Sequence, residues 1–121
     1  MPTLACLVVD HVPYGSLQPA EAIRHAGGAL GKGWGVVLAF MGAGVYTALP
    51  GQSPPAGEWI SLSQALAELI ESGKERVQVL VDRDSLDTFG LSADDLVFGL
   101  KPVPLEEMAR AIAGCDRALI F

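Results

Sequence analysis

Two cysteines and two histidines are the side chains best suited to covalent or acid–base chemistry in this 121-residue sequence. Cys6 and Cys115 stand near opposite ends of the chain and form no C-x-x-C pair. Cys6 falls within the apolar run L-A-C-L-V-V, which predicts a buried and inert thiol. Cys115 follows Gly114 at a predicted helix end and precedes Asp116, and both settings disfavour a thiolate. A structural thiol is therefore the favoured interpretation of Cys115, and a sulfur acceptor is the alternative.

The histidines offer acid–base chemistry, since an ordinary imidazole has a pKa of about 6.5. His11 follows the first apolar run, but no serine, cysteine or carboxylate motif is tied to it by spacing. A loop histidine with a local hydrogen bond is the simpler interpretation. His25 stands beside Arg24 in a predicted helix and indicates a solvated face. Two isolated histidines and two separated cysteines predict no metal site.

Two further sequence patterns match only in part the motifs of proteins that bind or transfer phosphate groups. The segment G-A-G-V-Y-T at 42–47 is similar to a dinucleotide-binding turn, but Thr47 replaces its third glycine. No acidic residue ends a strand about 20 residues later, so a tight packing turn is favoured. Asp10, Asp82 and Lys101-Pro102 resemble a response-regulator receiver. That match fails because histidine, not a second acid, follows Asp10, and because R-A-L-I-F follows the last predicted helix.

Alternating strands and helices must position these side chains. Continuous apolar runs predict buried strands at 4–9 and 36–40. V-Q-V-L-V at 77–81 predicts a third strand, 96–100 a fourth and 117–121 the last. A short strand or extended lead-in is expected at 59–62.

Helices are predicted over 17–31 with Ser16 as cap, from Ser61 to Gly73, and from Pro104 to Gly114, with a short helix after the glycine turn. This alternation predicts an α/β fold: a single-domain, three-layer α/β/α sandwich over residues 1–121, with a mostly parallel, roughly five-stranded sheet.

Ligands of such folds lie beyond the carboxyl ends of the strands. The residues that follow the first three predicted strands therefore form a candidate strand-end cleft for a small ligand. Its members are His11, Tyr14, Ser16, Gly42, Gly44, Asp82 and Ser85.

Composition narrows the class of protein. Hydrophobic residues make up 50% of the chain and charged residues only 18%, against about 25% in typical proteins. The chain therefore folds around a large core and keeps apolar surface for a partner. A net charge of −6 argues against direct nucleic-acid binding. No apolar run is long enough to span a membrane, and the first residues lack the basic start of a signal peptide, so we expect a cytoplasmic protein with reduced cysteines.

Taken in order, several segments resemble the DsrE/DsrF-like sulfur-relay family, and within it the DsrF/TusC branch. F-M-G-A-G-V-Y-T-A-L-P-G-Q at 40–52 is similar to the family's aliphatic strand, small-residue turn and L-L-P-G-Q. V-P-Y-G-S at 12–16 resembles its A-P-H-G-T loop, and 77–91 resembles V-x-V-x-V-C-x-x-S-L-x-x-R-G-L. Residues 104–121 also follow the branch.

The resemblance implies a role in persulfide transfer, but not as the sulfur carrier. Active DsrE/TusD-type subunits carry a sulfur-accepting cysteine where this chain has Asp82, and a carboxylate cannot hold a persulfide. The chain also has Tyr14 where histidine is frequent and Phe89 where arginine is common.

The expected function is therefore a non-catalytic, cofactor-free subunit that supports tRNA 2-thiouridine formation or sulfur oxidation. Its partners would be DsrE/TusD-like and DsrH/TusB-like subunits, or copies of itself. The alternatives are a sulfane-sulfur carrier that uses Cys115 and a small-ligand or nucleotide-binding α/β module.

Overall fold

A computed structural model describes residues 3–54, 56 and 61–121 of the chain. Within them, five strands form one sheet in the order β4-β3-β2-β1-β5, and every neighbouring pair is parallel. The strands are β1 (Leu4–Val9), β2 (Gly35–Phe40), β3 (Val77–Asp82), β4 (Lys101–Val103) and β5 (Arg117–Ile120). The predicted parallel α/β sheet is confirmed.

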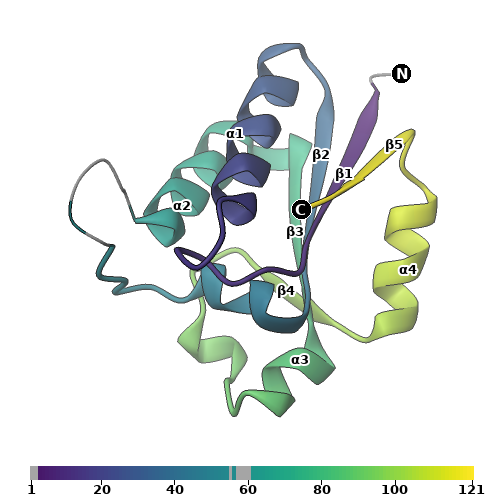
Figure 1. Cartoon of the computed structure of the whole chain (residues 1–121). Coiled ribbons are helices and arrows are strands. Elements are labelled where there is room, and N and C mark those ends of the chain that lie inside the picture. Colours follow the sequence, from purple (N-terminus) through teal and green to yellow (C-terminus); the bar gives the residue numbers. More distant parts are fainter. Residues whose placement is uncertain (1–2, 55, 57–60) are drawn as a thin grey trace.

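Helices cover both faces of this sheet. Helices α1 (Gln18–Gly31) and α2 (Leu62–Gly73) lie on one face and α4 (Leu105–Ala113) lies on the other (Figure 1). Helix α3 (Arg83–Thr88) and the 3-10 helix η1 (Gly42–Ala48) lie at the carboxyl ends of the strands (Figure 1). The short 3-10 turns η2 (Lys74–Arg76) and η3 (Ala93–Asp95) precede β3 and β4. The three layers are those that the sequence predicts.

Alternate side chains of the inner strands pack into two separate cores. Leu7, Leu38 and Val81 belong to the core under α1 and α2. Cys6 and Val8 point to the other face and pack in the core that contains Met108 of α4. Because both faces are covered, an inner strand needs apolar residues at nearly every position, which explains the continuous runs in the sequence.

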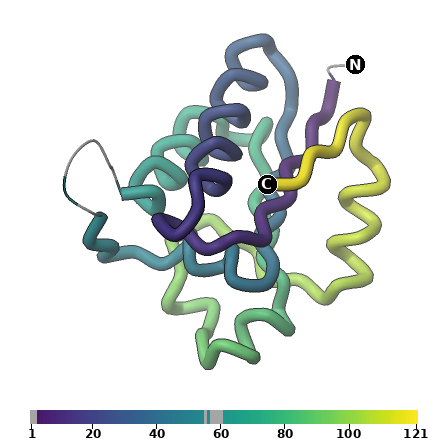
Figure 2. Tube along the Cα trace, in the orientation of Figure 1, coloured from purple at the N-terminus to yellow at the C-terminus, as the bar shows by residue number. Residues whose placement is uncertain are grey.

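Strand β5 differs from the inner strands. It lies at the margin of the molecule beside β1 (Figure 2), and all four of its residues are exposed. Leu119 is 50% exposed and Ile120 is 75% exposed, so this edge presents apolar side chains on both faces of the sheet.

The predicted fourth strand at 96–100 is wrong, because β4 begins only at Lys101. The Val97 N–H donates to the Ala48 carbonyl at 2.8 Å, which fastens this segment to the end of η1. Gly99 has a φ of 97°, which an extended strand does not tolerate. Of the expected lead-in at 59–62, residues 59 and 60 lie outside the described part.

The helix starts agree only in part with the predicted caps. Ser61 caps α2 as predicted, since its side chain accepts a hydrogen bond from the Gln64 N–H at 3.3 Å. Leu17, not Ser16, occupies the N-cap position of α1, and its side chain makes no capping hydrogen bond. Pro104 is the cap of α4 and not its first helical residue. No helix in the described segments is long and apolar enough to cross a membrane.

Substitution of Gly44 tests how tightly η1 packs on β1. A Cβ at Gly44 would lie 2.2 Å from the Val9 carbonyl oxygen, whereas a Cβ at Gly27 of α1 would meet open space. Gly44→Ala should therefore lower the free energy of unfolding by about 2–3 kcal/mol. Gly27→Ala should raise it by about 0.5–1 kcal/mol through helix propensity. Urea denaturation measures both, and equal stability of the two variants would contradict this packing.

Candidate functional site

Asp82, Ser85 and Gly42 form a hydrogen-bonded cluster at the carboxyl edge of the sheet. Asp82 ends β3 and occupies the N-cap position of α3, and it is only 7% exposed. Its Oδ2 accepts a hydrogen bond from the Ser85 hydroxyl at 2.6 Å. The Ser85 Oγ in turn accepts from the Gly42 N–H at 2.8 Å, which links α3 to η1. Three residues of the predicted strand-end cleft therefore meet.

The second carboxylate oxygen of Asp82 is left without a partner. Among the described residues, Asp82 Oδ1 and Thr47 Oγ1 are buried side-chain oxygens with no hydrogen bond. Leaving a buried acceptor unsatisfied costs stability, so Asp82 is not optimised for the fold alone. At the end of β3, the Asp82 carboxylate can accept a hydrogen bond or form an ion pair, but it cannot carry sulfur.

The other residues of the predicted cleft serve local contacts. His11 Nδ1 lies 2.8 Å from Asp10 Oδ1, and both side chains are half-exposed. This local pair matches the simpler interpretation of His11. Gly44 packs its backbone against Val9, which supports the packing interpretation of the glycine turn. The Ser16 Oγ accepts from the Gln18 N–H at 3.1 Å near the start of α1.

Tyr14 and Gln52 join three segments of the chain. The Tyr14 hydroxyl donates to Gln52 Oε1 and accepts from the Leu62 N–H at 2.8 Å. Gln52 Nε2 donates to the Thr47 and Leu49 carbonyls at 3.0 and 2.9 Å, at the end of η1. Gln52 was not predicted as a site residue, although it ends the A-L-P-G-Q segment that carries the family resemblance. Its contacts show that this segment connects η1 to the start of α2.

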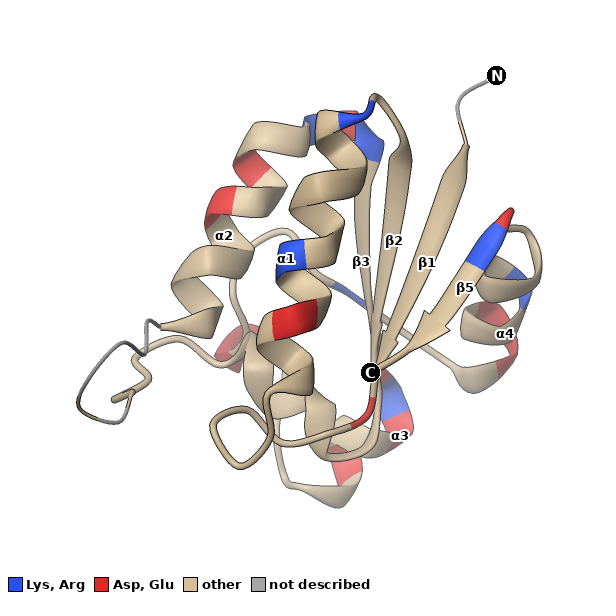
Figure 3. Cartoon of the chain, turned by 45° about the horizontal axis from the view of Figure 1, so that its top comes forward, with Lys and Arg blue, Asp and Glu red and all other residues tan. Residues whose placement is uncertain are grey.

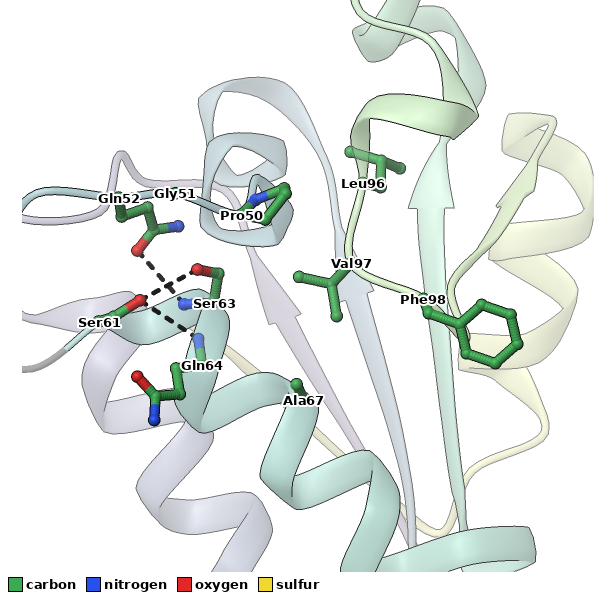
Figure 4. Close-up of a pocket in the computed structure, with 10 residues that line it drawn as sticks. All are labelled: Pro50, Gly51, Gln52, Ser61, Ser63, Gln64, Ala67, Leu96, Val97 and Phe98. Atoms are coloured by element: carbon green, nitrogen blue, oxygen red, sulfur yellow. Dashed lines mark hydrogen bonds between the residues drawn. The ribbon is translucent and has the colours of Figure 1, made fainter.

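A pocket of about 550 Å³ with a mixed polar and apolar lining lies beside this connection, and Figure 4 shows its walls. Pro50 to Gln52 and the start of α2 form one side, and Leu96 to Phe98 form the other (Figure 4). The Ser61 and Ser63 hydroxyls lie 3.1 Å apart and serve the start of α2. None of the seven predicted cleft residues, no cysteine and no histidine lines this pocket. Its walls combine serine hydroxyls and glutamine amides with the apolar side chains of Leu96, Val97 and Phe98.

Cys6 and Cys115 are far apart in the sequence but lie next to each other in the structure. Parallel pairing places Cys6 of β1 opposite Ala118 of β5, and Cys115 packs against the core that contains Cys6. Burial, and then the neighbouring Cys115, raises the pKa of Cys6 to about 12. Burial is also the main reason why the pKa of Cys115 is raised, and Asp116 adds to it, while a hydrogen bond to Cys6 opposes the rise. Both thiols therefore stay protonated at neutral pH.

The part of the chain that the structure describes contains no cluster of three or more His, Cys, Asp or Glu side chains placed to hold an ion.

The sequence profile of the DsrE/DsrF-like family matches residues 4–121. The chain belongs to the DsrE/DsrF-like family. The resemblance seen in the sequence is thereby confirmed at the level of the family.

Solved structures agree with this membership. The ychN protein of E. coli is 26% identical, with a TM-score of 0.83 and full coverage of both chains. MTH1491 from Methanobacterium thermoautotrophicum, a protein of unknown function, shares the fold at 14% identity, with a TM-score of 0.76 and coverage of 98% of this chain and 99% of its own. BT1422 from Bacteroides thetaiotaomicron, also of unknown function, does so at 14% identity, with a TM-score of 0.65 and coverage of 97% and 94%. No curated protein matches this chain in sequence.

Removal of the Ser85 hydroxyl tests the cluster at Asp82. Ser85→Ala leaves the Gly42 N–H and Asp82 Oδ2 without their shared partner, so we expect the free energy of unfolding to fall by about 1–3 kcal/mol. Thr88→Ala on the same helix removes an exposed hydroxyl and should change it by less than about 0.5 kcal/mol. Equal effects in urea denaturation would show that the cluster is energetically unimportant.

Thiol alkylation tests the protonation of the cysteines. Because the pKa of Cys115 is raised above 9.0, its reaction with iodoacetamide should accelerate about tenfold per pH unit through neutral and mildly alkaline pH. Cys6 should react only after unfolding. Peptide mass spectrometry separates the two sites. A Cys115 rate that levels off below about pH 8 would contradict the raised pKa.

Proposed function

We propose that this chain is a cysteine-independent subunit of a sulfur-relay complex and belongs to the DsrF/TusC branch. The observation that carries the proposal is Asp82, which stands where the resemblance places the sulfur-accepting cysteine of DsrE/TusD-type subunits. The carboxylate is buried at the end of β3 and hydrogen-bonded to Ser85. The position keeps a defined geometry, but its side chain has no sulfur chemistry.

Neither cysteine of the chain replaces the missing thiol. Cys115 precedes β5 and therefore lies at the amino end of the parallel sheet, whereas Asp82 lies at the carboxyl end. Cys6 is fully buried inside β1. The raised pKa of each thiol further reduces the thiolate needed to attack a persulfide. These features favour an assembly role over the alternative of a carrier that uses Cys115.

Exposed apolar side chains supply surfaces for assembly. Phe98 is 97% exposed, and Leu105 and Ile120 are also largely open to solvent. Ile120 lies on the edge strand β5, whereas Phe98 precedes β4 at the opposite edge of the sheet. Exposed large apolar side chains of this kind are typical of protein interfaces. The partners would be DsrE/TusD-like and DsrH/TusB-like subunits, or further copies, in a cytoplasmic complex for tRNA 2-thiouridine formation or sulfur oxidation.

Affinity purification from the native host tests the assembly. A tagged chain should retain a DsrE-like subunit that carries a cysteine at the position of Asp82, in a fixed ratio after size-exclusion chromatography. A monomer that recovers no such subunit would contradict the proposal.

A gain-of-function variant tests the role of position 82. After treatment with a polysulfide, the wild-type chain should gain no sulfur atom, because Asp82 cannot accept one and both native thiols stay protonated. Asp82→Cys should gain one sulfur on the new thiol. Asp84→Cys on the exposed start of α3 serves as the control for accessibility alone. Intact and peptide mass spectrometry locate the added sulfur.

Two outcomes would oppose this prediction. Sulfur on Cys115 of the wild-type chain would support the carrier alternative. Equal loading of Asp82→Cys and Asp84→Cys would show that position 82 is not special.

A further inference from the structure

A cavity of about 470 Å³ lies between α1 and strands β1 and β5, on the face of the sheet opposite α4. We call it the α1–β5 groove. Leu7 and Leu119 belong to its apolar floor, and Gly28 and Ala29 of α1 form its wall. The groove is open because Leu119 is half-exposed and because Gly28 has no side chain to fill the space. Its volume is in the range of small-molecule sites.

Positive side chains surround this apolar floor. Arg24 lines it from α1, Lys32 from the residue that follows α1, and Arg117 from β5. Three of the eight lysines and arginines thus gather at one groove of a chain whose net charge is −6. Figure 3 shows positive segments on α1 and at the start of β5.

These cations are not all neutralised within the chain. Arg24 pairs with Glu21, but the Lys32 ammonium lies 5.6 Å from the centre of the Trp34 ring in a cation–π contact. The Arg117 guanidinium makes no hydrogen bond or ion pair in the described part of the chain, and the neighbouring Asp116 carboxylate accepts from the Leu4 N–H instead. An anion that enters the groove would therefore find two positive groups available.

We propose that the α1–β5 groove binds a small amphipathic anion, an acyl chain or aromatic ring that ends in a carboxylate, sulfonate or phosphate. The apolar part lies on Leu7 and Leu119, and the anionic group lies against Arg117 and Lys32. Burial of the apolar part supplies the affinity, and the cations select the charge.

A second copy of the chain is a less suitable occupant. A two-fold interface brings the same patch of both copies together. Such a contact would place the Arg117 and Lys32 side chains of one copy close to those of the other. Like charges in contact oppose association, whereas a small anion neutralises them.

Binding of a fluorescent amphipathic anion to the intact, purified chain tests the proposal. Anilinonaphthalene sulfonate should bind one site and be displaced by decanoate, but not by decyltrimethylammonium. Displacement of the probe by both decanoate and decyltrimethylammonium would show that the cations do not select the charge of the ligand, and would contradict the proposal. Absence of a bound probe would overturn the proposal outright.

Two glycines of α1 provide a matched pair of variants. A side chain at Gly28 points into the groove, whereas one at Gly27 does not line it, and both positions meet open space. Gly28→Leu should weaken decanoate binding at least about tenfold, and Gly27→Leu should leave it within about twofold. Because both changes raise helix propensity, both variants fold. Equal affinities would place the ligand elsewhere.

The charge requirement has its own pair of variants. Arg117→Gln should weaken decanoate about fivefold to tenfold, as expected for the loss of one charge-assisted contact. Lys101→Gln, which removes an exposed lysine paired with Glu107, should leave binding unchanged. An unchanged affinity of Arg117→Gln would contradict the proposed placement of the anion.

Two further measurements separate other occupants from a small ligand. If the chain self-associates and Gly28→Leu dissociates it in sedimentation, the groove is an interface between copies and the proposal is wrong. If phosphatidylglycerol vesicles bind the chain while decanoate does not displace the probe, the groove recognises a membrane surface, and the proposal is equally overturned.

Discussion

The pairing of β1 with both β2 and β5 is the constraint on which the rest of this molecule depends. β1 runs parallel to each neighbour, and further hydrogen bonds extend its contact with β5 at both ends, from the Asp116 N–H to the Leu4 carbonyl and from the Phe121 N–H to the Val8 carbonyl. This pairing joins the two ends of the described chain. It places Cys115 beside Cys6 and holds β5 across from α1 to create the α1–β5 groove. It also leaves β5 as an edge strand, with no neighbour beyond it among the described residues.

The parallel sheet separates the molecule into regions with different chemistry. Its carboxyl edge carries Asp82, Ser85 and Gly42 in a compact hydrogen-bonded cluster, whereas its amino edge holds Cys115. In a parallel sheet these edges are a full strand length apart, so Cys115 and Asp82 cannot act on one group. The end of β3 holds a buried carboxylate and no thiol, and this is the physical basis of the proposed assembly role.

Sequence patterns predicted the inner elements well and the outer ones less well. The runs at 4–9, 36–40 and 77–81 became β1, β2 and β3, since burial on both faces demands uninterrupted apolar residues. The run at 96–100 is equally apolar but is held against η1 by a backbone hydrogen bond, so periodicity alone could not exclude it. Helix α3 lies in a polar stretch for which the sequence predicted no helix, because its six residues are too few to show a helical period.

The sequence by itself determined the α/β fold class, the family and the absence of a cysteine at the end of β3. Each of these depends on residue type or local order along the chain, which can be counted without coordinates. Only the tertiary structure decided that Cys6 and Cys115 are neighbours, that Gln52 binds Tyr14, and that the cations of α1 and β5 surround one groove. These are contacts between residues far apart in sequence. They arise from the order of strands in the sheet, and no local pattern encodes that order.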